Sequence, residues 1–476
     1  MINHQKQPIL PKVNNNMAKI EFDTQLIQKY DIAGPRYTSY PTAVQFTPDF
    51  TESDYRQQAV KSNLSGRDLS LYFHLPFCDT ICYYCACNKV ITKDRSKADP
   101  YLNLLHKEIA MQGQLFDSSR KVNQLHWGGG TPTFISHQQM AELMQVTRTH
   151  FNLHDDDSGE YSIEIDPREV THDSIKLLRD IGFNRMSLGV QDFDTAVQKA
   201  VNRIQSEEQT LNALNSAREF GFKSISTDLI YGLPLQTEKS FSSTLNRIID
   251  ISPDRISLFN YAHMPTLFKP QRRINEADMP SAEIKLNILK QSIEQLTNAG
   301  YVYIGMDHFA KPDDELSIAQ QQGKLYRNFQ GYATHADCDL VGMGITSIGT
   351  IDNSFAQNVK TLDEYQQLIG SGKLAVFRGV EIDLDDLLRR AVIMQLICHF
   401  ELNFSEIESK FSISFNEYFT DEIKRLAVML DDGLIEMNNH SIKVTPKGRL
   451  LIRNVCMVFD RYLNDKQTAQ RFSKAI

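Results

Sequence analysis

Short apolar segments alternate with amphipathic ones from residue 69 onward, and this alternation limits the possible folds more than any other feature of the sequence. Each apolar segment has the length of a strand, and the segments between them have the apolar spacing of helices, for example at 136–151, 172–182 and 207–221. Strands and helices in this order predict βαβ units around a parallel sheet. We expect strands at residues 69–77, 122–130, 161–167, 185–191, 224–234, 255–262 and 302–309.

Six or seven such units predict a full or partial (β/α) barrel of the TIM type rather than an open doubly wound sheet. In these barrels the chemistry takes place at the carboxyl ends of the strands. Glycine-rich or polar segments follow strand after strand, namely GGGTP, EIDP, GVQDF, DLIYGLP and NYAH. Such residues often do no more than end a strand. Their recurrence nevertheless predicts a functional site at this end of the barrel.

The sequence changes character after about residue 375. Residues 385–400, 419–434 and 448–463 read as helices, and residues 433–448 read as a hairpin, which together predict a small, mostly helical, winged-helix-like domain. A DNA-binding helix is basic, whereas FTDEIKRLAVMLDDG is acidic. We therefore expect a packing or substrate-binding accessory. The expected organisation is a leader without regular structure at 1–20, an N-terminal segment covering the barrel mouth at 21–68, the barrel at 69–370 and the helical domain at 371–476.

The overall charge excludes some classes of function. The 476 residues carry 51 Lys and Arg against 59 Asp and Glu, a net charge of −8, which argues against nucleic-acid binding. No segment reads as a signal peptide or as a membrane span. We therefore expect a cytoplasmic protein whose seven cysteines stay reduced.

Four of the seven cysteines, Cys78, Cys82, Cys85 and Cys87, lie within ten residues after the first predicted strand. A reducing compartment disfavours disulfides. A zinc site normally draws on two separated pairs of cysteines, whereas these four share one short loop. Thiolates also hold iron–sulfur clusters, and a site with three of them leaves one iron open to another ligand. An iron–sulfur site is favoured over zinc.

The C-x3-C-x2-C spacing in a β/α barrel resembles the radical S-adenosylmethionine (SAM) superfamily. The aromatic residue before the third cysteine, Tyr84, and the GGGTP segment at 128–132 also fit this superfamily. The resemblance implies a [4Fe–4S] cluster whose open iron binds SAM, and a 5′-deoxyadenosyl radical made from SAM. It also implies that Cys87 is not a ligand. The implied cluster ligands are Cys78, Cys82 and Cys85.

Further segments resemble one family in this superfamily, which acts on coproporphyrinogen III in bacterial heme synthesis. They are GPRYTSYPT at 34–42, CYYCACNK, HWGGGTPT, SIEIDPRE, GVQDF, DLIYGLP, NYAHMPT, GMDHFAKPDDEL and RNFQGY. The resemblance implies oxidative decarboxylation of two propionate side chains to vinyl groups, with two SAM molecules per substrate. It also implies an electron donor and an electron acceptor, neither of which the sequence identifies. We expect a monomer.

The same resemblance implies two sets of SAM contacts. Tyr72, Gly129, Glu164 and Ile348 match positions that hold the cluster-bound SAM. Tyr84, Gly130, Thr131, Gln191, Arg203, Asp228 and Ala262 match contacts of a second SAM. Each position also has a plainer interpretation. Glu164 sits where an acid can simply end a strand, Tyr72 alternates with apolar residues as in ordinary barrel packing, and Arg203 is of a residue type common on surfaces.

The substrate of this family carries four carboxylates, so arginines near the barrel mouth are candidates to bind it. Arg36 in GPRYTSYPT is such a candidate, and the alternative is that it only anchors the N-terminal segment. Two other functions remain as rivals. One is a heme chaperone of the same superfamily, a class that usually lacks the GPRYTSYPT segment and the residue matching Cys87. The other is a zinc-stabilised DNA-binding regulator, which the acidic charge disfavours.

Overall fold

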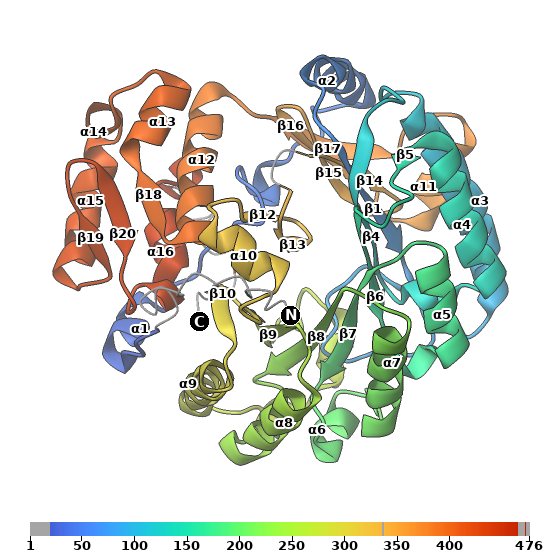
Figure 1. Ribbon diagram of the computed structural model, residues 1–476, viewed down its shortest axis with the longest axis horizontal. Helices are drawn as coiled ribbons and strands as arrows, with labels where there is room; N and C mark the ends of the chain where they lie inside the picture. The colour runs from blue at the N-terminus through green and yellow to red at the C-terminus, as the bar shows by residue number, and fades with distance from the viewer. Residues whose placement is uncertain (1–19, 336–337, 465–471, 473–476) are drawn as a thin grey trace, which may run out of the picture.

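The computed structural model describes residues 20–335, 338–464 and 472. The leader expected at 1–20 lies almost wholly outside these residues. Six strands pair in parallel and in chain order to form the wall of a barrel (Figure 1). They are β1 (Leu69–Leu75), β4 (Lys121–Gly129), β6 (Glu160–Ile165), β7 (Arg185–Gln191), β8 (Ser224–Tyr231) and β9 (Arg255–Asn260). The predicted succession of βα units is confirmed.

Helices cover the outside of this wall (Figure 1). They are α3 (Ala98–Gly113), α4 (His137–His150), α5 (His172–Asp180), α7 (Glu207–Glu219), α8 (Glu238–Ile251) and α9 (Ala282–Asn298). Their starts follow local chemistry. Ser136 and Ser206 each form a capping box with the glutamine three residues later, which satisfies amide groups that the first turn leaves free.

The sheet continues beyond both ends of the six-stranded wall without closing. Next to β1 lie β14 (Asp339–Met343), which is parallel to it, and then the antiparallel strands β15 (Ile348–Ile351), β16 (Ser354–Asn358) and β17 (Val376–Glu381). The other end carries β11 (His308–Ala310) and β10 (Val302–Gly305). The prediction of a partial barrel is confirmed, because the strand order runs from β10 to β17 as an open path.

One predicted strand is wrong. Residues 302–309 form two short antiparallel strands, β10 and β11, instead of one parallel strand. The chain reverses at Gly305 and Met306, which have φ angles of +147° and +53°. Positive φ angles break an extended strand. As a result β11 runs antiparallel to β9, with His308 opposite Ser257.

The strands divide their side chains between two environments. On β1 the apolar residues Leu71 and Phe73 are fully buried beneath the helices, whereas Ser70, Tyr72 and His74 alternate with them and face the inside of the barrel. The one tryptophan, Trp127, is fully buried and packs against Phe73 and Phe183. The inner face of the barrel therefore presents polar side chains that can contact a ligand, and the outer face packs apolar side chains against the helices.

Up to Val444 the C-terminal part holds four α-helices and a three-stranded sheet, a winged-helix-like arrangement as predicted. The helices are α12 (Leu384–His399), α13 (Phe404–Phe411), α14 (Phe415–Tyr418) and α15 (Thr420–Asp431), and the strands are β18 (Glu401–Asn403), β19 (Ile435–Met437) and β20 (Ser441–Val444). The boundary expected at 370/371 falls inside the barrel sheet, because β17 pairs with β16. We propose that the small domain starts after Glu381.

The helix predicted at 448–463 is interrupted. It consists of η7 (Arg449–Leu451), α16 (Ile452–Met457) and η8 (Arg461–Asn464). The amides of residues 458, 459 and 460 bond to carbonyls three residues back, which tightens the chain and ends α16. This turn keeps Phe459 and Asp460 buried, with 0% and 2% of their surfaces exposed.

The N-terminal segment contacts both parts of the molecule. After α1 (Thr24–Tyr30), the carbonyl of Pro35 accepts a hydrogen bond from Arg453 Nε at 2.9 Å, and the Tyr37 hydroxyl donates to Asp460 at 3.0 Å. Thr47 forms an isolated bridge with Gly379 of the barrel sheet before α2 (Glu52–Ser65) begins. In the described part of the chain no helix has the length and apolar character needed to cross a membrane.

Candidate functional site

The cysteine loop begins where β1 ends. Cys78 belongs to the short strand β2 (Phe77–Cys78), which pairs with β3 (Val90–Ile91) and so closes the base of the loop. The loop is also fixed in the middle. Asn202 Nδ2 donates to the carbonyl of Ile81 at 2.7 Å, and the amide of Tyr83 donates to the carbonyl of Val201 at 2.9 Å. The loop is therefore held at the carboxyl end of the barrel.

Hydrogen-bond donors surround the sulfur atoms. Arg168 Nη2 and Arg203 Nη1 lie 3.8 and 3.7 Å from the Cys82 sulfur, and the Thr131 hydroxyl lies 3.5 Å from the Cys78 sulfur. Positive charge and donors of this kind stabilise thiolates. Burial raises the pKa of Cys78 to about 12, and the hydrogen bond from Thr131 offsets only part of this rise. For Cys85, a hydrogen bond with the Cys87 thiol is the main cause that lowers the pKa to about 6.

Among the residues that the structure describes, no group of three or more His, Cys, Asp and Glu side chains is arranged to hold one metal ion. A [4Fe–4S] cube does not require such a group, because each of its thiolate ligands binds a different iron. Three thiols on one loop, with cationic donors beside them, fit that kind of centre in donor type and number.

The three glycines at the end of β4, residues 128–130, allow close packing. A Cβ atom on Gly130 would lie 2.7 Å from the carbonyl oxygen of Phe77, and one on Gly129 would lie 2.7 Å from the His74 ring. The amides of Gly130 and Thr131 donate to the carbonyls of Leu75 and Phe77 at 2.8 and 2.7 Å. These two hydrogen bonds tie β4 to the chain that enters the cysteine loop.

Glu164 lies at the end of β6 and receives two hydrogen bonds. Its oxygens accept from the amide of Gly129 at 3.0 Å and from His126 Nε2 at 3.3 Å. Burial raises the pKa of Glu164, but the bonds from His126 and Gly129 outweigh burial and hold the pKa below its usual value. Glu164 is therefore an ionised carboxylate that can still accept hydrogen bonds from an ammonium group or hydroxyls.

Tyr72 is positioned by a short chain of hydrogen bonds. His74 Nε2 lies 3.0 Å from the carbonyl of Asn88, so this nitrogen carries the proton and donates. The other ring nitrogen then accepts from the Tyr72 hydroxyl at 3.2 Å. Tyr72 also stacks on His126, with ring centroids 5.9 Å apart and planes at 11°.

Arg203 lies between the cysteine loop and β7. Nη1 pairs with Asp166 at 3.0 Å and Nη2 donates to the carbonyl of Gly189 at 2.6 Å. Asp166 also pairs with Arg168 at 2.6 Å, and the two arginines outweigh burial to lower its pKa to about 2. Two buried atoms in this corner, Arg203 Nε and Gln191 Oε1, have no protein partner. Such atoms are suited to bind a polar ligand.

The other predicted contacts line the same end of the barrel. Asp228 on β8 accepts from the Ser187 hydroxyl at 2.9 Å, and burial raises the pKa of Asp228 to about 6. Ala262 follows β9. Ile348 begins β15, next to Gly342, which is the register partner of Tyr72. The structure thus brings strands β1, β4, β6, β7, β8 and β15 together at the predicted place.

Three residues of this site are not predicted from the sequence. His74 and His126 face inward on β1 and β4, and the sequence pattern could have indicated this, because both alternate with apolar residues along their strands. Gln271 had no such signal. Its Nε2 donates to the carbonyls of Tyr84 at 3.1 Å and Ala262 at 3.3 Å, which links the cysteine loop to the segment after β9.

Arg36 has a partner within the protein. Its guanidinium forms an ion pair with Asp307, in the turn between β10 and β11, and its carbonyl accepts from Arg327 Nε at 3.4 Å. These contacts are those expected if Arg36 anchors the N-terminal segment.

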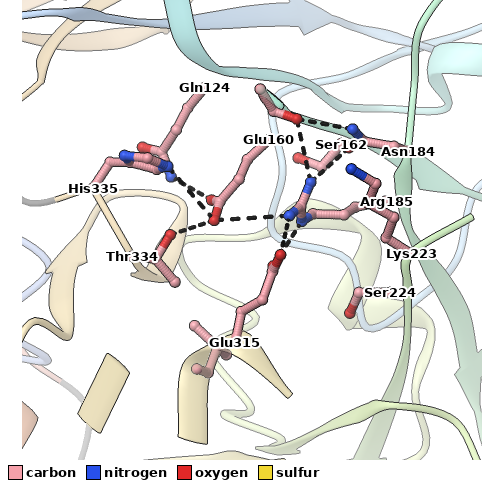
Figure 2. A network of polar contacts seen from close by, with 12 residues as sticks. Gln124, Glu160, Ser162, Asn184, Arg185, Lys223, Ser224, Glu315, Thr334 and His335 are labelled. Atoms are coloured by element: carbon pink, nitrogen blue, oxygen red, sulfur yellow. Dashed lines mark hydrogen bonds and ion pairs between the residues drawn. The ribbon is translucent and has the colours of Figure 1, made fainter. Parts of the chain in front are cut away.

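The opposite end of the barrel holds a separate ion network, shown in Figure 2. Glu160 and Arg185 are the first residues of β6 and β7, and Arg185 pairs with Glu315 at 2.5 Å. Glu160 accepts from Gln124 Nε2 at 2.8 Å and from the Thr334 hydroxyl. Polar residues at the amino ends of barrel strands usually serve stability. This network forms the floor of the barrel.

Comparison with known proteins agrees with this geometry. The family model described as the radical SAM superfamily matches residues 72–248, and the model of the HemN C-terminal domain matches residues 382–451. The fold and the cysteine loop thus define a radical SAM enzyme. The chain is 54% identical over 457 residues to oxygen-independent coproporphyrinogen III oxidase of Pseudomonas aeruginosa, covering 96% of this chain and 99% of the relative.

The Escherichia coli enzyme of the same name is 50% identical, over 97% of this chain and all of the relative. A solved structure of coproporphyrinogen III oxidase (HemN) from Escherichia coli, described as a radical SAM enzyme, superimposes with a TM-score of 0.89, covering 93% of this chain and 100% of that one at 49% identity. The chain therefore belongs to the oxygen-independent coproporphyrinogen III oxidase family, and the predicted family is confirmed.

Proposed function

We propose that this chain converts coproporphyrinogen III to protoporphyrinogen IX without oxygen, by oxidative decarboxylation of two propionate side chains to vinyl groups. Each propionate loses one hydrogen atom from its β-carbon, one molecule of carbon dioxide and one electron, which passes to an acceptor. The support is the three-cysteine loop at the carboxyl end of a barrel, in a chain that matches enzymes of this name over nearly its whole length.

The proposed cofactors are a [4Fe–4S] cluster and two molecules of SAM. Cys78, Cys82 and Cys85 are the proposed cluster ligands, with Cys87 outside the cluster. When bound, the cluster and SAM supply a 5′-deoxyadenosyl radical, which is needed because the β-C–H bond of a propionate is not activated. The protein contributes position, charge and exclusion of water.

The proposed roles of the chain's own residues follow from their contacts. Glu164, which is ionised and held by Gly129 and His126, accepts hydrogen bonds from the amino group of the cluster-bound SAM. Tyr72 and Ile348 are the proposed neighbours of the same SAM molecule. Around the second SAM, Arg203 Nε and Gln191 Oε1 provide a donor and an acceptor without protein partners. The remaining proposed contacts of the second SAM are Tyr84, Gly130, Thr131, Asp228 and Ala262.

One anaerobic experiment tests the proposal. Reconstituted protein, incubated with coproporphyrinogen III, SAM and a reductant, is expected to contain about four irons per chain and to release protoporphyrinogen IX and 5′-deoxyadenosine. Cys82→Ala is expected to lose iron and both products, whereas Cys398→Ala, in α12 of the small domain, should retain them. Absence of both products from an iron-loaded wild-type protein would contradict the proposal.

The proposed setting of the enzyme is the cytoplasm, where it acts as a monomer with an electron donor and an electron acceptor. Sedimentation of the cluster-loaded protein tests the oligomeric state, and a single species of about 54.5 kDa is expected.

A further inference from the structure

A small pocket lies on the inner side of the barrel wall, above the floor network and below the layer of Tyr72. Strands β1 and β4 supply Ser70 and Gln124, which are register partners. The short strand β12 (Tyr326–Asn328) supplies Arg327, and helix α12 supplies Arg390. We propose that this pocket binds a carboxylate of the tetracarboxylate substrate, with Arg327 as the principal ligand. The proposal rests on the proposed function and names a substrate contact within it.

The pocket has positive charge without a matching negative one. Within the described parts of the chain, neither Arg327 nor Arg390 forms an ion pair, and no Asp or Glu lines the pocket. Arg327 is only 4% exposed and lies over the ring of Tyr332, with its carbon Cζ 4.7 Å from the ring centroid. Burying a guanidinium without a carboxylate is energetically unfavourable, because the charge loses its hydration and gains no counter-charge. An anionic ligand would remove this penalty.

Unsatisfied atoms around the pocket indicate which groups the ligand must offer. Among the residues that the structure describes, Arg327 Nη1 and Ser70 Oγ are buried donors with no hydrogen-bond partner. A carboxylate accepts from both, and the planar guanidinium matches carboxylate geometry. Gln124 Oε1 is a buried acceptor without a partner, and its Nε2 is fixed on Glu160. A pyrrole N–H of the substrate, or a water carried in with it, satisfies that acceptor.

The nearby acid does not neutralise the pocket. Figure 2 shows Glu160 in contact with Gln124, Thr334, His335 and Arg185. Arg185 and, when it is protonated, His335 are its cationic partners, at 3.9 and 3.8 Å. Burial raises the pKa of Glu160, but Arg185 is the largest of the partners that bring it below its usual value. Glu160 is thus held by the floor network, and within the described residues it forms no ion pair with Arg327.

The position also suits a porphyrinogen. Ser70 and Tyr72 are two residues apart on β1, so the pocket lies roughly 7 Å below the layer of Tyr72. A macrocycle with four propionates can place one of them near the proposed SAM site while another reaches the pocket. Arg36, the candidate from the sequence, is already paired with Asp307. The structure therefore favours Arg327 over Arg36 as the carboxylate ligand.

Binding of coproporphyrin III, the stable oxidised form of the macrocycle, tests this inference by fluorescence on the full-length, cluster-loaded protein. Arg327→Gln is expected to raise the Kd at least tenfold and the KM for coproporphyrinogen III to a similar extent, and Arg327→Lys to have a smaller effect. Arg378→Gln, which removes a cation on β17 outside the pocket, should leave both unchanged. Iron content and SAM affinity should match wild type in all three variants.

Removing the charge from the ligand provides the reciprocal test. With the tetramethyl ester of the same porphyrin, Arg327→Gln and wild type should bind equally. An unchanged Kd and KM in Arg327→Gln would overturn the inference even if wild type makes product. If Arg327→Gln does not fold, Arg390→Gln serves instead, with a Kd raised at least threefold as the expected result. A wild type that binds coproporphyrin III through Arg327 but forms no product would contradict the proposed function alone.

Discussion

Gly130 allows β4 to touch the segment that leads into the cysteine loop. The site of a Cβ atom on this residue is already occupied by backbone, with the Phe77 oxygen and the Pro76 carbonyl carbon both at 2.7 Å. Backbone cannot rotate away as a flexible side chain can. A glycine here therefore fixes the distance between β4 and Cys78, the first of the proposed cluster ligands.

Gly130→Ala is expected to push Pro76 and Phe77 away and to move Cys78 with them. Overpacking of this kind costs about 1–3 kcal/mol of unfolding free energy. The iron content after anaerobic reconstitution should fall by at least half. Gly370→Ala, at the end of α11 (Leu362–Gly370), is the matched control, because nothing lies within 4 Å of its Cβ position. Equal iron content in the two variants would contradict this account.

At the scale of elements, the short helix η5 (Lys269–Arg273) supports the cysteine loop from the β9 side. Gln271 is 1% exposed, and all its contacts are with backbone. Besides the carbonyls of Tyr84 and Ala262, it meets the amide of Met264, which donates to Oε1 at 2.5 Å. This side chain thus replaces the strand pairing that an irregular loop lacks.

Gln271→Leu should leave three backbone groups without partners and loosen the loop. We expect a loss of about 2–6 kcal/mol in unfolding free energy, since a buried unsatisfied group costs about 1–3 kcal/mol. Only two of the three groups count in this sum, because Ala262 is exposed and water can replace its bond. Amide hydrogen exchange of residues 79–88 should become faster. Gln295→Leu, on the outer helix α9, is the control and should leave that peptide unchanged. If the amides of residues 79–88 exchanged at the same rate in Gln271→Leu as in wild type, η5 would not support the loop.

At the scale of the whole molecule, Asp460 joins the N-terminal segment to the small domain. It accepts from Tyr37 at 3.0 Å and from the amide of Tyr462 at 2.9 Å, and burial raises its pKa to about 6. The charged or titratable groups that interact with it are Tyr37, Tyr40, Asp386, Arg389 and Cys456. Because the folded protein holds this proton more tightly than the unfolded chain, the contribution of Asp460 to stability is present at low pH and is lost as the pH rises through about 6.

Asp460→Asn stays neutral at every pH and should remove this dependence. Relative to wild type, the variant is expected to gain about 1–1.5 kcal/mol of unfolding free energy between pH 5 and pH 8, measured by urea unfolding. Asp432→Asn is the control. Hydrogen bonds from Lys29 and Tyr30 lower the pKa of Asp432, so this change should shift stability equally at both pH values. If the unfolding free energies of Asp460→Asn and wild type changed equally between pH 5 and pH 8, the raised pKa of Asp460 would be contradicted.

The sequence predicts well what depends on local pattern. The six parallel strands are predicted by short apolar segments that alternate with amphipathic ones. The cysteine spacing predicts the loop, and the cluster ligands implied by the resemblance stay a prediction. The turn at Gly305 and Met306 was missed because no strong turn pair marks it. Gln271 was missed because its role depends on backbone 187 residues away in sequence, which no local pattern records.

The contacts of the N-terminal segment have a consequence for the making of the protein. Arg453 and Asn454 bond to the carbonyls of Pro35 and Tyr30 across 418 and 424 residues of sequence. During synthesis Tyr30 and Pro35 therefore leave the ribosome more than 400 residues before the two side chains that bind them. The barrel strands can form before Arg453 and Asn454 are made, but the attachment of the N-terminal segment to the small domain through these bonds cannot.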